Sequence, residues 1–271
     1  MEWKNIYRGL AMGASDVIPG VSGGTIAVLL GIYDRLIAAI NGITSKEWKR
    51  HLGFLIPLGL GMVIAIFLLA NIIEWLFEHY PDPTQFFFLG LIIGVLPYLF
   101  NQADAKTTFK AKHFLLLLLG AVIIGSMAFF NAEESAVMSE MNFSTYVLLF
   151  FSGFAGSAAM IIPGISGSFV LLVIGVYVTV IEAISNLYFD IIIVTGLGIA
   201  VGILVMSKII HYFLTNHHSA TFALIIGLVI GSTVVIFPGW AGTFPIMIAS
   251  ILTFAAGLAV AYILGRVEYK E

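Results

Sequence analysis

Long apolar segments separated by short polar ones dominate the chain. Six of them are long enough to cross a bilayer as helices: residues 53–78, 84–100, 113–130, 191–214, 220–237 and 243–265. A membrane-spanning helix needs about 20 mainly apolar residues. Two other apolar stretches, residues 10–40 and 143–184, are interrupted by proline and glycine. The pattern predicts an all-α integral membrane protein with about six full transmembrane helices and two broken ones.

The two interrupted stretches carry the same motif. Residues 18–40 read IPGVSGGTIAVLLGIYDRLIAAI and residues 162–184 read IPGISGSFVLLVIGVYVTVIEAI, with ten identities in 23 gapless positions at an offset of 144. Several identities are Pro, Gly, Ser or Tyr, so shared hydrophobicity does not explain the match. Helix breaks repeated in two halves of a chain are typical of transporters built from an internal duplication.

The match continues beyond the motif at a second offset. Residues 90–94 (GLIIG) correspond to residues 227–231 (GLVIG), which is an offset of 137. We therefore expect a single transporter domain over residues 1–271, made of repeat 1 (about 1–130) and repeat 2 (about 143–271).

Composition agrees with a membrane environment. Of the 271 residues, 60% are hydrophobic and 10% are charged, whereas soluble domains carry about 25% charged residues. The formal net charge is -3 and the chain contains no cysteine. Disulfides, thiolate metal sites and cysteine nucleophiles are therefore excluded.

The basic residues predict the topology. They flank the first interrupted stretch on both sides: Lys4, Arg8, Lys46, Lys49 and Arg50. Because Lys and Arg concentrate on the cytoplasmic side, that stretch should enter the membrane and return. Continued alternation places residues 46–50, residues 106–112 and both termini in the cytoplasm, and the acidic segment 131–142 outside. Each half then has one re-entrant hairpin and three crossings, an odd number, so the sequence predicts an inverted-repeat bundle.

The Pro-Gly pairs are predicted to interrupt the helix within each of the two re-entrant hairpins. These pairs are Pro19 with Gly20 and Pro163 with Gly164. Proline lacks a backbone donor and ends a helix. Backbone groups freed at membrane depth must be buried in protein or line a wet cavity.

Small polar residues follow each break, where the next helix should begin. They are Ser22, Gly23, Gly24 and Thr25 in the first copy, and Ser166, Gly167 and Ser168 in the second. Exposed amides at a helix N-terminus bind anions. We therefore predict a substrate-binding site for a phosphate or carboxylate where the two tips meet. The alternative is that these residues only permit a tight hairpin and close helix packing.

Three charged residues in the apolar stretches are further candidates, since such charges are costly unless they are paired or used. Arg35 could hold an anionic head group, because a guanidinium matches phosphate geometry. Asp16 and Glu182 could carry a proton or another coupling cation. Alternatively, Arg35 could pair with Asp34 or reach the cytoplasmic interface, and Asp16 could cap a helix.

Other functions find little support in the sequence. His211, His217 and His218 lack a carboxylate at ligand spacing, so we expect no metal and no cofactor. The chain has no P-loop, and no nucleic-acid partner is indicated. Its serines have no histidine partner within the membrane segments for nucleophilic catalysis, so we expect the protein not to be an enzyme.

The motif residues also resemble those of a known family. Residues 13–37, GASDVIPGVSGGTIAVLLGIYDRLI, and residues 158–177, AAMIIPGISGSFVLLVIGVY, closely resemble the paired signatures of the PopT family of bacterial polyprenyl-phosphate transporters, formerly a domain of unknown function. The resemblance covers nearly the whole chain. It implies translocation of undecaprenyl phosphate from the outer to the inner leaflet of the bacterial cytoplasmic membrane, for reuse in cell-envelope synthesis. The implied partners are undecaprenyl phosphate, membrane lipids and a coupling cation such as a proton.

The resemblance also implies where the site lies. The matching motif positions are Asp16, Pro19, Gly20, Ser22, Gly23, Pro163, Gly164, Ser166 and Gly167. The second copy has Ser168 where the first has Gly24, and Met160 where the first has Asp16. The two tips should therefore differ in their chemistry.

Two other functions remain open from the residues alone. One is ion-coupled transport of a small soluble organic or inorganic anion through the same site. The other is a membrane enzyme that modifies lipid phosphates. A lateral slot between helices would favour a lipid substrate, whereas a closed vestibule would favour a soluble ion.

Overall fold

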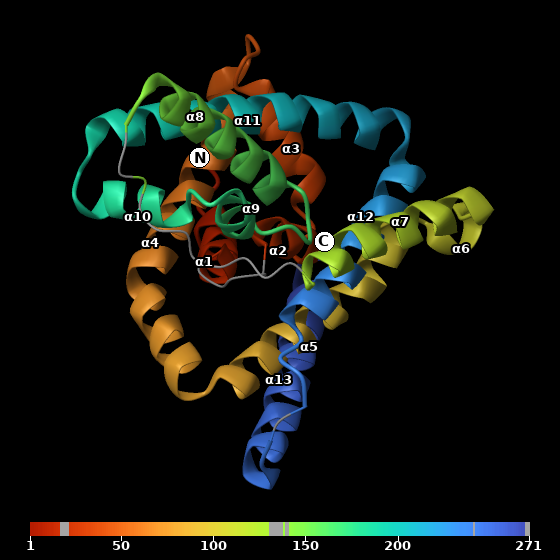
Figure 1. Cartoon of the computed structure of the whole chain (residues 1–271). Helices are drawn as coiled ribbons and strands as arrows, with labels where there is room; N and C mark the ends of the chain where they lie inside the picture. The colour runs from red at the N-terminus through yellow and green to blue at the C-terminus, as the bar shows by residue number, and fades with distance from the viewer. Residues whose placement is uncertain (17–21, 130–137, 139–140, 241, 269–271) are drawn as a thin grey trace.

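The computed structural model describes residues 1–16, 22–129, 138, 141–240 and 242–268. All regular secondary structure in these residues is helical (Figure 1). The first half contains α1 (Asn5–Asp16), α2 (Gly23–Leu29), α3 (Tyr33–Gly42), α4 (Trp48–His79), α5 (Pro81–Gln102), α6 (Ala105–Thr108) and α7 (Ala111–Met127). The second half contains α8 (Phe143–Ile161), α9 (Gly167–Ile174), α10 (Tyr177–Ser185), α11 (Phe189–Asn216), α12 (His218–Ile236) and α13 (Phe244–Glu268). The predicted all-α polytopic fold is confirmed.

Six of the described helices are long and apolar enough to cross a membrane: α4, α5, α8, α11, α12 and α13. The number agrees with the prediction, but the set differs. Helix α7 has only 17 residues, because the apolar run that began at residue 113 turns at Ala128 and Phe129. Helix α8 was predicted to be one arm of the second hairpin. It runs without interruption for 19 residues and is long enough to span on its own.

Each repeated motif bends the chain sharply. The chain bends by 119° between α2 and α3, and by 110° between α9 and α10. The bends fall at Gly31, with φ of 63°, and at Gly175, with φ of 84°. Glycine adopts this left-handed conformation without the steric cost of a side chain. The sequence prediction had a single break in each copy, and the structure adds this second one.

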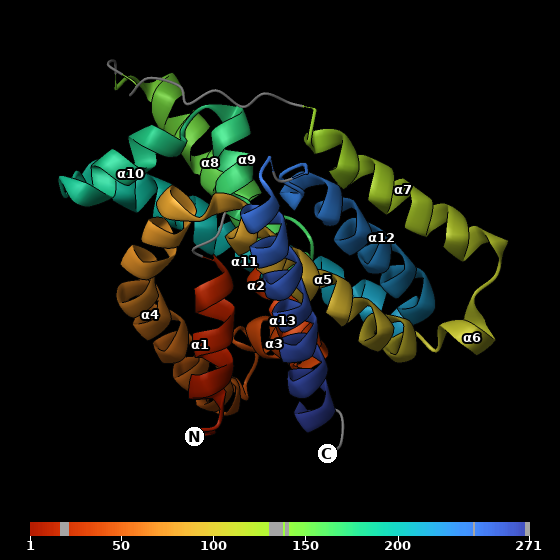
Figure 2. The same cartoon turned by 90° about the horizontal axis from the view of Figure 1, so that it is seen from below.

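The long helices pack in four close pairs (Figure 2). Helix α1 packs on α4, and its counterpart α8 packs on α11. The other two pairs exchange helices between the halves, because α5 packs on α13 and α7 packs on α12.

Glycines make these close approaches possible. The same glycine contact occurs in both repeats, at the sequence offsets of 144 and 137. A Cβ atom on Gly61 would clash with the Ile6 carbonyl oxygen, and one on Gly198 would clash with that of Phe150. Ile6 and Phe150 are 144 residues apart, and the two glycines are 137 apart. Small residues let backbones approach closely, which is how helices associate in membranes. The same packing contact is therefore built twice.

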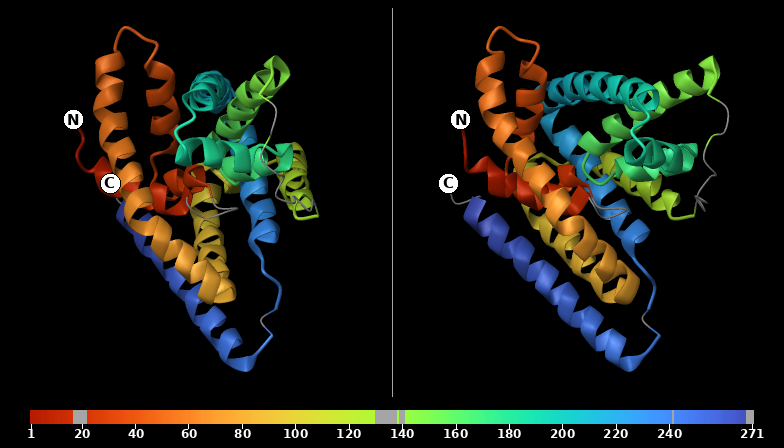
Figure 3. Two further views of the ribbon diagram at one scale, coloured as in Figure 1. Left: turned by 60° about the vertical axis from the view of Figure 1, so that its left-hand side comes forward. Right: turned by 90° about the vertical axis from the view of Figure 1, so that its left-hand side faces the viewer.

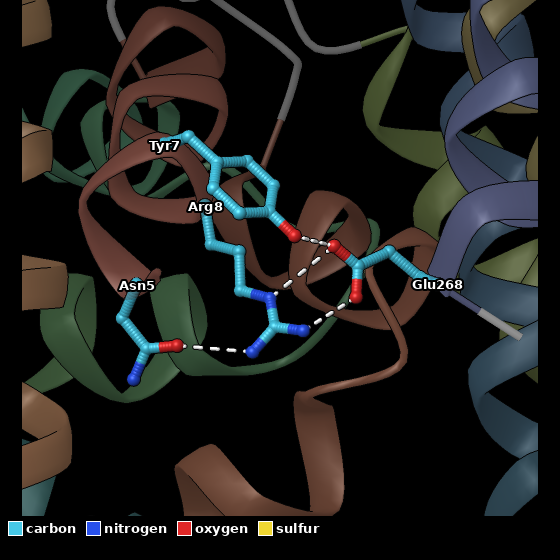
Figure 4. A network of polar contacts seen from close by, with 4 residues as sticks. All are labelled: Asn5, Tyr7, Arg8 and Glu268. Atoms are coloured by element: carbon cyan, nitrogen blue, oxygen red, sulfur yellow. Dashed lines mark hydrogen bonds and ion pairs between the residues drawn. The ribbon is translucent and has the colours of Figure 1, made fainter. Parts of the chain in front are cut away.

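Both chain ends lie on the same side of the molecule (Figure 3). A polar network joins the start of α1 to the end of α13 (Figure 4). Arg8 Nη2 lies 2.5 Å from Glu268 Oε2, its Nη1 donates to Asn5 Oδ1 at 3.0 Å, and the Tyr7 hydroxyl also donates to Glu268. The side chains of Arg8 and Glu268 are only 12% and 4% exposed. Buried charges are tolerated when paired in this way, and losing one partner costs about 3–5 kcal/mol.

Candidate substrate-transport site

The polar residues after each break start a new helix, as predicted. Ser22 is the N-cap of α2, and its Oγ accepts a hydrogen bond from the Gly24 amide at 3.2 Å. Ser166 is the N-cap of α9, and its Oγ accepts from the Phe169 amide at 3.5 Å. A serine at this position satisfies a backbone donor that the helix itself cannot.

Residues that follow the first break contact the second break. Gly164 donates its amide hydrogen to Thr25 Oγ1 at 2.9 Å. The Tyr33 hydroxyl donates to the Ile161 carbonyl at 3.2 Å, and Ser22 Oγ lies 3.4 Å from the Met160 carbonyl. Side chains of the first motif thus satisfy the backbone groups that the second break frees.

The described part of this junction is tightly packed. Every residue of α2 is buried, and Ser22 and Thr25 are 2% and 1% exposed. Beside the start of α9, the cavity lined by Ser166 and Phe169 has a volume of only about 10 Å³. The start of α2 therefore meets the second break, and the described residues at this contact are buried.

Asp16 bridges the first break. Its Oδ1 accepts a hydrogen bond of 2.7 Å from the Gly23 amide, while its buried Oδ2 has no partner among the described residues. The carboxylate thus occupies the N-terminal end of α2, where the sequence predicted an anion. The second copy has Met160 at this position, so the start of α9 has no corresponding carboxylate.

The start of α9 offers hydroxyl groups instead. The side-chain oxygens of Ser166 and Ser168 lie 2.9 Å apart. Between them, Gly167 lets the start of α9 approach the backbone of α8 closely, because a Cβ atom there would lie 2.6 Å from the Gly156 carbonyl oxygen. Of the two tips, the second is therefore the one whose helix N-terminus holds no acidic side chain.

The proline-glycine pairs are seen only in part. Pro19 and Gly20 lie outside the described residues. In the second copy, Gly164 follows Pro163 with φ of 88°, and a Cβ atom on it would lie 2.7 Å from the Leu228 carbonyl carbon. Only glycine suits this position, because it combines a left-handed backbone with direct packing on α12.

The structure does not bring Arg35 or Glu182 to the tips. Arg35 pairs with Glu2, stacks 4.8 Å from the ring centre of Phe54 and keeps its side chain 55% exposed. Glu182 lies on α10 beside Asp190, in a separate cavity of about 380 Å³. Both residues therefore lie outside the polar junction.

An apolar cleft adjoins the second break, and sequence reasoning did not locate it. It has a volume of about 350 Å³, lies between α7, α11 and α12, and reaches Tyr33 and Ile162. Met206, Phe213 and Leu228 line it. Tyr33 was a detectable signal, because it is one of the identities of the repeated motif and matches Tyr177.

No metal centre emerges from the described part of the chain, where no three His, Asp or Glu residues cluster suitably. His218 begins α12, and its Nε2 lies 3.1 Å from the Gln102 carbonyl oxygen. Since a carbonyl only accepts, Nε2 carries a proton in this contact.

Comparison with known proteins places the chain in a family. The family model described as "VCA0040-like: Undecaprenyl phosphate translocase-like" matches residues 12–253, which include both motif copies. A protein of Staphylococcus aureus (strain NCTC 8325 / PS 47) named "Polyprenyl-phosphate transporter" is 43% identical over 278 residues, covering 100% of this chain and 98% of the relative. A protein of the same name from Vibrio cholerae serotype O1 (strain ATCC 39315 / El Tor Inaba N16961) is 37% identical over 253 residues, covering 88% of this chain and 79% of the relative. No solved structure matches significantly. The chain is a multi-pass membrane protein and belongs to the VCA0040-like, undecaprenyl phosphate translocase-like family.

Proposed function

We propose that this protein transports polyprenyl phosphate across the bacterial cytoplasmic membrane, moving undecaprenyl phosphate from the outer to the inner leaflet for reuse in cell-envelope synthesis. The names of the two relatives and of the family support this substrate. The structural observation that carries the proposal is the apolar cleft that reaches the polar junction at Tyr33 and Ile162. Transport of a soluble anion does not require an apolar cleft. An isoprenoid phosphate requires a polar surface for its head group beside an apolar surface for its tail.

The head group would cross at the start of α9. A phosphate at membrane depth is prohibitively costly unless donors replace its water. The hydroxyls of Ser166 and Ser168 and the first amides of the helix supply such donors. The tail stays in the cleft and in the surrounding lipid. No chemical step on the phosphate is required, so the protein acts as a transporter and not as an enzyme.

Passage of the head group requires the tips to separate. The bonds from Gly164 to Thr25 and from Tyr33 to the Ile161 carbonyl hold them together. We propose that the two repeats are inverted in the membrane and open the junction to one leaflet at a time. The repetition of the glycine contacts at both sequence offsets supports this symmetry.

The proposed orientation can be tested by labelling. Arg35 pairs with Glu2 and its neighbour Asp34 faces His218, which supports a common side for the N-terminus and the start of α12. Glu47→Cys and Lys106→Cys should resist a membrane-impermeant maleimide in intact cells, whereas Met141→Cys should react. The cysteine-free chain provides the blank. Labelling of position 47 from outside would contradict the cytoplasmic assignment of residues 46–50. In the proposed external segment, residues 131–137, 139 and 140 lie outside the described residues.

Transport itself is tested in proteoliposomes with a leaflet-resolved assay. The purified protein should move undecaprenyl phosphate and neither undecaprenol nor phosphatidylcholine. Ser166→Ala/Ser168→Ala should lower the rate about tenfold or more, because each hydrogen bond to a charged group contributes about 1.5–3 kcal/mol. Ser185→Ala is the control, since this exposed serine bonds only the Ile181 carbonyl of its own helix.

Two results would direct attention to the other functions. Uptake of soluble phosphate without movement of the lipid would favour a transporter of small anions. Release of inorganic phosphate from the lipid would show an enzyme. Equal movement of all three lipids would remove the head group as the selective element.

A further inference from the structure

A second polar cavity lies away from the helix tips. It has a volume of about 490 Å³ and is lined by Thr107, Thr108, Lys110, Lys112, His217 and His218. Helices α7 and α12 both begin at this cavity, beside the short helix α6 (Figure 2). Two segments that are about 100 residues apart in the sequence therefore build one site.

The cavity is positively charged. Lys110 and Lys112 are exposed, and within the described ranges no carboxylate lies at ion-pair distance from either. Helix α12 begins at His218, and its N-cap His217 makes no side-chain capping bond, so amides of the first turn remain available. An opposing charge is Asp34, which interacts electrostatically with His218. Helices α6 and α11 also end at this cavity, at Thr108 and Asn216, so the helix dipoles offset one another and the two lysines supply its positive charge.

This cavity adjoins the apolar cleft. His217 and Ala220 line both of them. From these two residues the cleft extends to Tyr33 and Ile162 at the second break. One end of the path is thus cationic and polar, and the rest is apolar. That combination fits an amphiphile with an anionic head group and a hydrocarbon tail.

The basic residues occur in only one of the two repeats. At the offset of 137, Lys110 and Lys112 correspond to Met247 and Ala249, and His217 and His218 correspond to Tyr80 and Pro81. The apolar lining is kept, since Ile210 corresponds to Ile73 and Leu228 to Leu91. The apolar lining residues are therefore kept in both repeats, whereas the basic residues of this cavity have no counterpart in the other repeat.

We infer that this cavity is a landing site for the phosphomonoester of the transported lipid on the cytoplasmic side, with the isoprenoid tail in the adjoining cleft. The inference rests on the proposed function. Lys110 and Lys112 hold the phosphate after it leaves the α9 tip, and His217 marks the junction of head group and tail. Because the opposite end lacks these charges, the site favours the lipid on one side of the membrane.

The first experiment measures occupancy without transport. Ala220→Cys, in the cysteine-free chain, lines both the cavity and the cleft. Undecaprenyl phosphate in mixed micelles should slow its reaction with a maleimide several-fold, whereas undecaprenol and phosphatidylglycerol should not. Equal protection by phosphatidylglycerol would overturn the inference, since the lysines would then be a general anchor to anionic lipid.

The second experiment removes the charge. Lys110→Gln/Lys112→Gln should weaken binding of undecaprenyl phosphate about tenfold, as expected for lost charge-assisted bonds, and should abolish the protection of Ala220→Cys. Lys46→Gln/Lys49→Gln removes two lysines at the start of α4 and should change neither. If the first double variant fails to fold, His217→Ala gives the same test.

The outcomes separate the inference from the proposed function. If wild-type protein moves undecaprenyl phosphate and the Lys110/Lys112 variant binds it as tightly as the control variant, the landing site is wrong and the transport function stands. If wild-type protein moves no undecaprenyl phosphate, the proposed function fails first.

Discussion

Gly198→Ala is expected to lower the free energy of unfolding by about 2–3 kcal/mol, whereas Gly196→Ala on the same helix should be neutral or slightly stabilising. A Cβ atom on Gly198 would clash with the Phe150 carbonyl oxygen of α8, and one on Gly196 would have nothing within 4 Å. Overpacking of a tight contact costs about 1–3 kcal/mol. In a helix with free space, alanine is favoured over glycine by about 1 kcal/mol. Thermal unfolding of the purified protein in detergent measures both effects.

The first repeat provides an independent copy of this test. Gly61→Ala should behave like Gly198→Ala, because its Cβ atom would clash with the Ile6 carbonyl oxygen of α1. Gly59→Ala should behave like Gly196→Ala, because nothing lies within 4 Å of it. Equal losses of stability at all four positions would mean that close backbone approach is not what holds α1 to α4 and α8 to α11.

Asp16→Asn is expected to abolish gradient-driven transport while leaving the protein folded. The asparagine oxygen can still accept the bond from Gly23, so the break keeps its support. The change removes the one buried carboxylate oxygen at the junction that has no partner among the described residues, and with it the group proposed to take up a proton or another cation. Undecaprenyl phosphate should then only equilibrate between leaflets, at the rate measured without an ion gradient.

Glu182→Gln is the matched control for Asp16. Glu182 is the other acidic candidate, but it lies in a separate cavity beside Asp190. We expect this variant to keep its response to the gradient. Loss of the response in Glu182→Gln, with a normal response in Asp16→Asn, would move the coupling group from the junction to α10.

The starts of the central helices could be predicted because their determinants are local. A serine N-cap after a proline-glycine pair specifies where α2 and α9 begin, whatever surrounds them. The bends at Gly31 and Gly175 were missed because an apolar run containing one glycine is also compatible with a straight helix. Their recurrence at the same motif position was the available signal.

The chemistry of the site was harder to predict because its contacts are long-range. Arg35 is directed to Glu2, which is 33 residues away in sequence, and no local pattern indicates this partner. Asp16 was recognised as either a cap or a carrier, but only the fold shows that it bridges the break to Gly23. The cavity around Lys110 and His217 joins segments about 100 residues apart.

The exchange of helices between the halves has a consequence for how the protein is made. Helix α5 is synthesised long before its packing partner α13. Arg8 likewise gains its partner Glu268 only after a further 260 residues have been synthesised. The first half must therefore wait in the bilayer with a glycine-lined face uncovered.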